Sequence, residues 1–222
     1  MIVLGLTGSL GMGKSTAAGM LRRLGIPVHD ADAAVHRLLG KAGAAVQDVA
    51  REFPAARAGD RIDRTALGRR VFGDAAALRR LEAILHPMVR AEENRFLAAA
   101  RRRREPVVVL DIPLLFETGG EARCDGVIVV SAPLWLQRQR VLRRPGMTEA
   151  RLRAIRVQQM PDREKRRRAT WVVPTGLSRA ATLRRLKRIL RMVRGGDVAA
   201  KQSCRSRSQK INRRDTEDTE VS

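Results

Sequence analysis

The sequence predicts an α/β fold with a parallel sheet, because apolar runs alternate with helical patterns along most of its 222 residues. Two observations support this prediction. The chain opens with an apolar run, a glycine-rich turn and a helical stretch, and four further apolar runs follow. The predicted strands are Ile2–Leu6, Ile26–His29, Val107–Asp111, Gly126–Val130 and Trp171–Val173. Hydrophobic residues make up 44% of the chain, which is enough for a buried core.

The first apolar run leads into a phosphate-binding loop. Gly8, Gly13, Lys14 and Ser15 fit the G-x-x-x-x-G-K-[ST] pattern, and an alanine-rich helix is expected directly after it. Glycines let successive backbone N–H groups approach phosphate oxygens. Lys14 would reach the β- and γ-phosphates, and the Ser15 hydroxyl would coordinate magnesium. The strand before the loop and the helix after it favour this interpretation over a chance match, so the sequence predicts a nucleoside triphosphate site.

A long helical stretch, Arg64 to Arg104, separates the second and third predicted strands. It is too long for a simple crossover, so we interpret it as a substrate-binding insertion. Pro87 is expected to start or kink a helix within it. The helix Arg179–Val193 closes the fold, and Gly195 with Gly196 ends it. The polar, mixed-charge tail 197–222 lacks apolar periodicity and is predicted to be disordered.

Two aspartates, Asp30 and Asp32, follow the second predicted strand. Ligands of open α/β sheets bind outside the carboxyl ends of the strands, so both carboxylates are expected near the phosphate-binding loop. One of them could accept or orient the proton of an acceptor hydroxyl. The alternative is that they are a helix N-cap and a turn residue. Spacing alone leaves both open, with Asp30 expected to be the more structural of the two.

Asp111 ends the apolar run Val107–Asp111. An aspartate in this position resembles a Walker B residue, which would hold magnesium through water. The alternative is a buried structural aspartate.

The formal net charge of +22 raises a second possible function. Clustered cations favour nucleic-acid binding, because they release phosphate counterions. Arginine greatly outnumbers lysine, which indicates a compositional background, and runs such as Arg101–Arg104 are expected to be solvated helix faces. A positive field also steers anionic substrates. We therefore expect small-molecule substrates and no specific nucleic acid.

The two cysteines, Cys124 and Cys204, lie far apart without the spacing of a zinc site. The N-terminal apolar run is too short for a signal peptide, and no segment approaches the roughly 20 apolar residues that span a membrane. These observations predict a cytoplasmic protein without a membrane partner. They say nothing of its oligomeric state.

Six segments, in their order along the chain, resemble the dephospho-coenzyme A kinase family. The phosphate-binding loop alone is common to many NTPases, whereas the Asp-Ala-Asp, Leu-His-Pro and Asp-Ile-Pro-Leu-Leu-Phe-Glu segments are far more specific. The segments are Gly5–Thr16, Leu24–Asp32, Ile62–Phe72, Leu81–Val89, Asp111–Glu117 and Gln159–Ala169. The resemblance covers roughly residues 1–194 and leaves the tail unexplained.

The resemblance implies transfer of the ATP γ-phosphate to the ribose 3′-hydroxyl of dephospho-CoA, giving CoA and ADP. Asp32 matches the aspartate that engages this hydroxyl, and Arg140 and Arg144 match arginines of a mobile lid. Closing arginines would stabilise transition-state charge and exclude water. The positions that match the ATP-binding stretch are Gly11, Met12, Gly13, Lys14, Ser15 and Thr16.

The resemblance also assigns the insertion to the CoA moiety and places His86 near that site. The alternative for His86 is a histidine that caps a helix broken at Pro87. The expected organisation is a P-loop NTPase core (1–60 and 105–196), an insertion at about 61–104 and a lid at about 136–150. Another small-molecule kinase, such as a nucleoside monophosphate kinase, and a nucleic-acid-binding ATPase remain the alternative functions.

Overall fold

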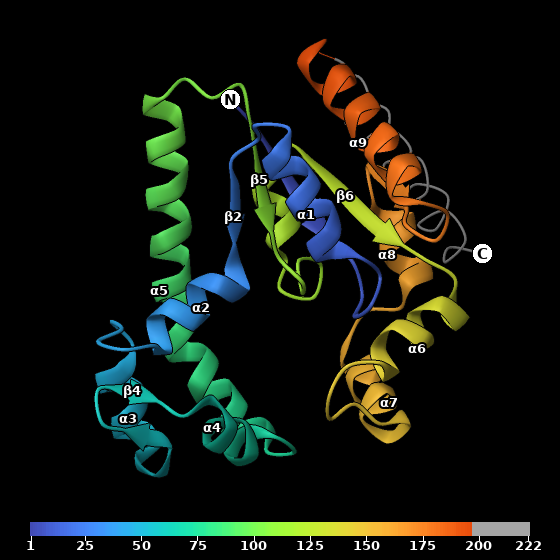
Figure 1. Ribbon diagram of the computed structural model, residues 1–222. Helices are drawn as coiled ribbons and strands as arrows, with labels where there is room; N and C mark the ends of the chain where they lie inside the picture. Colours follow the sequence, from blue (N-terminus) through green and yellow to red (C-terminus); the bar gives the residue numbers. More distant parts are fainter. Residues whose placement is uncertain (197–222) are drawn as a thin grey trace, which may run out of the picture. The chain divides into compact units, whose positions relative to one another are not determined.

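The computed structural model describes residues 1–196, which divide into two compact units (Figure 1). The first unit contains Met1–Val28 and, among the described residues, 106–196. The second unit is His29–Glu105. The tail 197–222, for which disorder was predicted, lies outside the described residues.

A five-stranded sheet has the strand order β2-β5-β1-β6-β7. The strands are β1 (Ile2–Thr7), β2 (Val28–Asp30), β5 (Val107–Asp111), β6 (Gly126–Ser131) and β7 (Trp171–Pro174). β1 pairs in parallel with both β5 and β6, and β6 pairs in parallel with β7. β5 and β6 are buried along their whole length, as parallel strands covered on both faces are. The predicted α/β fold with a parallel sheet is confirmed.

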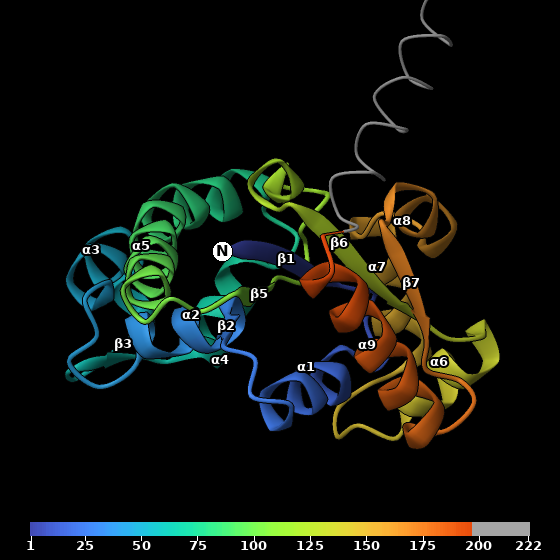
Figure 2. The same ribbon diagram turned by 90° about the horizontal axis from the view of Figure 1, so that it is seen from above.

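Helices of the first unit cover both faces of this sheet (Figure 2). The helical elements of this unit are α1 (Lys14–Arg23), η2 (Gly120–Arg123), α6 (Leu134–Leu142), α7 (Glu149–Gln158), α8 (Asp162–Arg168) and α9 (Arg179–Arg194). α1 and α9 pack on one face, where Leu6 and Leu186 belong to one apolar cluster. α8 and the segment after β5 lie on the other face, over a smaller cluster that includes Leu115 and Val129. α9 ends at Arg194, with Gly195 as its C-cap, so a glycine follows the helix as predicted.

The second unit has an apolar core of its own, formed mainly by side chains from four α-helices. Its elements are α2 (Ala31–Leu39), α3 (Val46–Glu52), η1 (Pro54–Ala56), β3 (Arg57–Ala58), β4 (Arg61–Ile62), α4 (Arg64–Val71) and α5 (Ala75–Arg102). Leu38 of α2 and Val49 of α3 belong to the same buried cluster as Leu67 and Leu85. Because α2 and α3 pack with α4 and α5, this unit begins at His29, earlier than the predicted insertion at about residue 61. The short hairpin of β3 and β4 was not predicted.

Of the two outcomes expected at Pro87, a helix start is wrong, because α5 continues through Pro87 to Arg102; a kink at this residue stays a prediction. The helical stretch is interrupted earlier, at Gly73, which has a left-handed φ of 83°. The Asp74 carboxylate then accepts a hydrogen bond from the Ala77 N–H at 2.8 Å and caps α5. Although α5 has 28 residues, no helix among residues 1–196 is both long and apolar enough to cross a membrane.

His29 is expected to make the stability of the second unit depend on pH. Its ring lies 5.4 Å from that of Phe96, its Nε2 has no hydrogen-bond partner within residues 1–196, and burial lowers its pKa below the ordinary value of 6.5. Glu93, Glu92 and Asp30 raise this pKa and Arg37 lowers it, but burial is the largest effect. A lowered pKa means that the unfolded chain binds more protons, so the free energy of unfolding falls as the pH falls through about 6.5.

We therefore expect the melting temperature of the wild-type protein to fall more steeply than that of His29→Phe between about pH 7.5 and pH 5. His36→Gln is the matched control, since His36 is exposed. Differential scanning fluorimetry across this range measures the effect. Parallel pH profiles for the wild type and His29→Phe would contradict the assignment.

Candidate functional site

The phosphate-binding loop joins β1 to α1 and depends on three glycines. Gly11 and Gly13 have left-handed φ values of 77° and 89°, which side-chain-bearing residues rarely adopt. Gly8 is needed for a different reason: a Cβ there would lie 2.4 Å from Val130 Cγ2 of β6. Gly13 is the N-cap of α1 and has no side chain to satisfy the first amides of the helix. Those N–H groups and the positive end of the helix dipole form an anion-binding site.

Lys14 and Asp111 form an ion pair beside this loop. Lys14 Nζ lies 2.8 Å from Asp111 Oδ1. The aspartate, the last residue of β5, is only 2% exposed, and the lysine side chain is 15% exposed. The two residues were predicted separately, and the structure brings them together. The ammonium therefore lies at the start of α1, directly after the glycine loop.

The other residues of the predicted ATP-binding stretch divide into buried and exposed positions. Met12 is 1% exposed, and its sulfur lies 3.1 Å from the Ala132 backbone nitrogen, so its side chain belongs to the core. Ser15 and Thr16 lie on the first turn of α1 and are exposed. Their hydroxyls are therefore accessible to a ligand at the helix N-terminus.

Arg140 of α6 contacts the loop through Thr175. Its Nη2 donates to the Thr175 carbonyl at 2.8 Å, and its Nη1 lies 3.3 Å from Thr175 Oγ1 and 3.5 Å from the Gly11 carbonyl. Thr175 Oγ1 in turn donates to the Met12 carbonyl at 2.7 Å. Arg140 is thus held against the phosphate-binding loop. Arg144, just after the same helix, is exposed.

Three residues that hold the loop, Thr175, Gln137 and Gln159, were not predicted from the sequence. Gln137 is 2% exposed, and its Nε2 donates to the Leu10 carbonyl at 2.7 Å. Gln159 Oε1 accepts from the Leu10 N–H at 3.1 Å. The loop is therefore held on both sides of Leu10. Gln159 begins one of the segments that resemble the family, but nothing in its type or spacing indicates a contact with Leu10.

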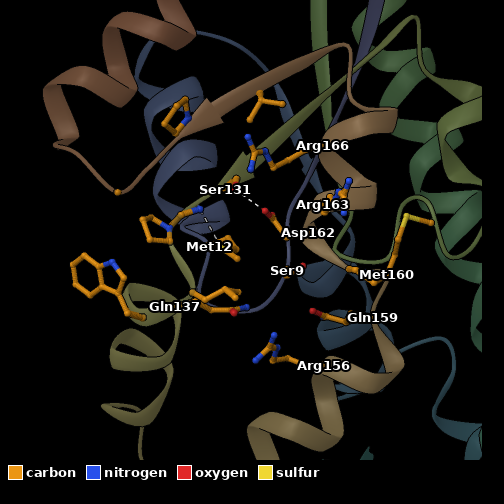
Figure 3. Close-up of a pocket in the computed structure, with 18 of the residues that line it drawn as sticks. Ser9, Met12, Ser131, Gln137, Arg156, Gln159, Met160, Asp162, Arg163 and Arg166 are labelled. Atoms are coloured by element: carbon orange, nitrogen blue, oxygen red, sulfur yellow. Dashed lines mark hydrogen bonds between the residues drawn. The ribbon is translucent and has the colours of Figure 1, made fainter.

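A cavity of about 1150 Å³ borders the loop at Ser9 and Met12 (Figure 3). Gln159 and Met160 line it from the junction between α7 and α8. Asp162 is the one acidic side chain among the described residues that line it, and its Oδ2 accepts from Ser131 Oγ at 2.8 Å. The arginines that line it are Arg153, Arg156, Arg163 and Arg166. The space beside the loop is therefore strongly electropositive.

The remaining predicted site residues belong to the second unit. Asp30 is the N-cap of α2 and accepts from the Ala33 N–H at 3.0 Å, which confirms its structural role. Asp32 lies in the first turn of α2 and is exposed. His86 is exposed in the interior of α5, so the alternative of a histidine capping a helix broken at Pro87 is wrong.

Sequence comparisons give a single result along nearly the whole described chain. A family model described as dephospho-CoA kinase matches residues 2–178. The chain is 62% identical over 200 residues to the dephospho-CoA kinase of Paramagnetospirillum magneticum, a match that covers 90% of this chain and 94% of that relative. It is 60% identical over 196 residues to the dephospho-CoA kinase of Rhodospirillum rubrum, with coverages of 88% and 93%.

Solved structures agree with the fold. The crystal structure of a Thermus thermophilus protein, TT1252, superimposes with a TM-score of 0.74 at 44% identity and covers 85% of this chain and 96% of that one. The dephospho-CoA kinase from Campylobacter jejuni gives a TM-score of 0.66 at 24% identity, with coverages of 88% and 98%. The second match supports the arrangement of strands and helices alone.

Proposed function

This chain belongs to the dephospho-CoA kinase family, and from that membership we infer that it phosphorylates dephospho-CoA with ATP in coenzyme A biosynthesis. We propose that the γ-phosphoryl group passes to the ribose 3′-hydroxyl, giving CoA and ADP. The observation that carries the phosphoryl-transfer chemistry is Lys14, held 2.8 Å from Asp111 beside the glycine loop. The identity of the acceptor rests on the family.

On the nucleotide side, the backbone from Gly11 to Thr16 would bind the phosphates of ATP. Lys14 would place its ammonium on the β- and γ-phosphate oxygens, where negative charge grows during transfer. Arg140 already lies against this loop through Thr175 and would add a second cation. Arg144 is exposed at the end of α6 and would reach the phosphates on closure of the lid.

Magnesium would bind together with the triphosphate. The Ser15 hydroxyl is a hard oxygen donor, exposed on the first turn of α1 directly after Lys14, and so fits this ion. Asp111 offers a carboxylate at the same place, with Oδ1 facing Lys14. When bound, magnesium neutralises charge on the β- and γ-phosphates.

On the acceptor side, Asp32 would accept or orient the proton of the 3′-hydroxyl, because an exposed carboxylate that does not cap the helix is available for that proton. His86 would contact the CoA moiety from α5. The second unit would then bind the acceptor substrate with its own helices.

A substrate panel tests the proposal. ADP release is measured with dephospho-CoA, with nucleoside monophosphates and with RNA as the added component. We expect ADP release only when dephospho-CoA is the added component. RNA should bind weakly, in a salt-sensitive way, and should leave ATP hydrolysis unchanged. Preferential turnover of a nucleoside monophosphate, or stimulation of the ATPase by RNA, would replace the proposal with one of those activities.

Arg140→Ala should reduce kcat by about 10²-fold, the scale for removing one charge-stabilising donor from a transition state. Arg138→Ala is the matched control, because Arg138 lies on the same helix but pairs with Glu149 at the surface. Steady-state kinetics at saturating ATP and dephospho-CoA measure both variants. Equal kcat values for the two variants would remove Arg140 from the mechanism.

A further inference from the structure

Lys165 of α8 is completely buried, although it precedes three exposed arginines in sequence. Burial disfavours the charged form of an ammonium unless it is paired and hydrogen-bonded. The exposed run Arg166–Arg168 shows that the helix could direct a cation to solvent at this end. The position of Lys165 therefore calls for a specific set of partners.

Those partners belong to the loop that follows β5. Lys165 Nζ lies 2.9 Å from Glu117 Oε1 and donates to the Pro113 carbonyl at 3.3 Å. The same carbonyl accepts from Thr7 Oγ1 at 2.9 Å. Thr7 is the last residue of β1, and Pro113 follows Asp111 by two positions. The ammonium thus contacts the loop that extends from the carboxylate paired with Lys14.

Glu117 connects this loop to the junction between α7 and α8. Its Oε1 also accepts from the Met160 N–H at 2.8 Å. The preceding residue, Gln159, accepts from the Leu10 N–H of the phosphate-binding loop at 3.1 Å. One short segment is therefore bonded to both loops that form the nucleotide site (Figure 3 shows Gln159 and Met160 beside Ser9).

We propose that Lys165 is a positioning residue for the kinase reaction. Its ammonium fixes the loop after Asp111 and, through Glu117 and Met160, the junction that holds Leu10. Lys165 does not contact the reacting groups; it sets the place from which Asp111 faces Lys14. A displacement of about 1 Å in such a group can lower a rate about 10²-fold. This inference rests on the proposed function for its readout.

The two charges of the Lys165–Glu117 pair can be removed singly or together. Replacing a buried ion pair by neutral residues is often harmless to stability, whereas removing one partner leaves an unpaired buried charge. A structural role and a positioning role therefore predict different outcomes when both charges are removed. Removing both charges can restore the stability of the protein. It cannot restore the hydrogen bond that the Lys165 ammonium donates to the Pro113 carbonyl.

The test compares Lys165→Met with the double variant Lys165→Met/Glu117→Gln. The amide that Glu117→Gln introduces keeps an oxygen for the Met160 N–H, so the double variant removes the two charges and the ammonium donor while it retains that acceptor. We expect Lys165→Met to melt at a lower temperature than the wild type and the double variant to recover part of this loss. In both variants we expect kcat to fall about 10- to 100-fold, with the KM for ATP changed by less than about threefold.

Lys187→Met is the matched control, because Lys187 is exposed on α9 and should leave kcat within about twofold of the wild type. The kinetics are measured well below the melting temperature of each variant. If neither Lys165 variant folds, Glu117→Gln alone is measured, and a wild-type kcat in that variant would overturn the positioning role. A wild-type kcat in the folded double variant would overturn the positioning role. If the wild-type protein does not turn over dephospho-CoA, the proposed function is overturned instead. The Lys165 variants would then be compared with the wild type on the acceptor found in the substrate panel.

Discussion

Lys14→Ala should reduce turnover by about 10³-fold or more. Lys14 is the first residue of α1, directly after the glycine loop, and its ammonium lies 2.8 Å from Asp111 Oδ1. Without it, the charge that develops on the β- and γ-phosphates loses its main protein partner. Coupled measurement of ADP release at saturating substrates tests this expectation.

The same substitution should also lower stability. Asp111 is 2% exposed, and breaking a buried ion pair by removing one partner costs about 3–5 kcal/mol. A lysine that pointed only into the ligand site would leave stability unchanged on substitution, whereas the ion pair predicts a loss of stability. The melting temperature of Lys14→Ala should therefore fall.

The double variant Lys14→Ala/Asp111→Asn separates the two effects. Removing the carboxylate charge should restore part of the melting temperature, because no buried charge is then left facing the missing ammonium. Turnover should stay at or below the level of Lys14→Ala, because Asp111→Asn also removes a carboxylate that would serve magnesium. Near-normal turnover in Lys14→Ala would overturn the role of Lys14. Near-normal turnover in the double variant alone would show that Lys14 and Asp111 serve stability and not phosphoryl transfer.

The parts of the fold that follow from local chemistry could be predicted. Buried parallel strands are apolar runs, and the phosphate-binding loop requires glycine wherever its backbone is left-handed or touches a neighbouring strand. Val107–Asp111 was predicted to the residue for that reason. Asp30 was expected to be the more structural of two aspartates, and it caps α2.

Boundaries set by packing could not be predicted in the same way. Pro87 lacks one N–H and disfavours a helix interior, yet the remaining hydrogen bonds and the buried side of α5, which includes Leu81 and Leu85, keep the helix continuous. Propensity is local, whereas the energy that holds α5 comes from contacts with α2, α3 and α4.

The contacts that hold the site together involve residues far apart in sequence. Gln137, Gln159 and Thr175 each bond the phosphate-binding loop across more than 100 positions. A single sequence shows that these residues are polar but not which backbone group they meet. In the sequence Lys165 directly precedes the run Arg166–Arg168, and its burial distinguishes it from these neighbours.

Asp32→Asn should reduce turnover by roughly 10²–10⁴-fold, the usual range for loss of a general base. The amide keeps the shape of the side chain but cannot take the proton of the 3′-hydroxyl. ATP affinity should change little, because Lys14 and the loop amides would bind the nucleotide. Isothermal titration with an ATP analogue and steady-state kinetics measure the two quantities separately.

Two competing roles for Asp32 predict other outcomes. A magnesium ligand would be partly replaced by raising the magnesium concentration, whereas a missing base would not. A helix cap would lower the melting temperature on substitution, but Asp30 already accepts from the Ala33 N–H. An exposed carboxylate in the first turn of a helix contributes only about 0.3–1 kcal/mol through the helix dipole. We therefore expect a small change in the melting temperature and no rescue by magnesium.

Asp30→Asn is the matched control for this experiment, because it makes the same chemical change two residues away. Asparagine is as good an N-cap as aspartate, so α2 should keep its start and turnover should stay within about twofold of the wild type. The contrast between the two variants isolates the carboxylate of Asp32 from the helix that carries it. If Asp32→Asn turns over as fast as Asp30→Asn at saturating substrates, Asp32 is not the base, and the proton of the acceptor hydroxyl leaves by another route.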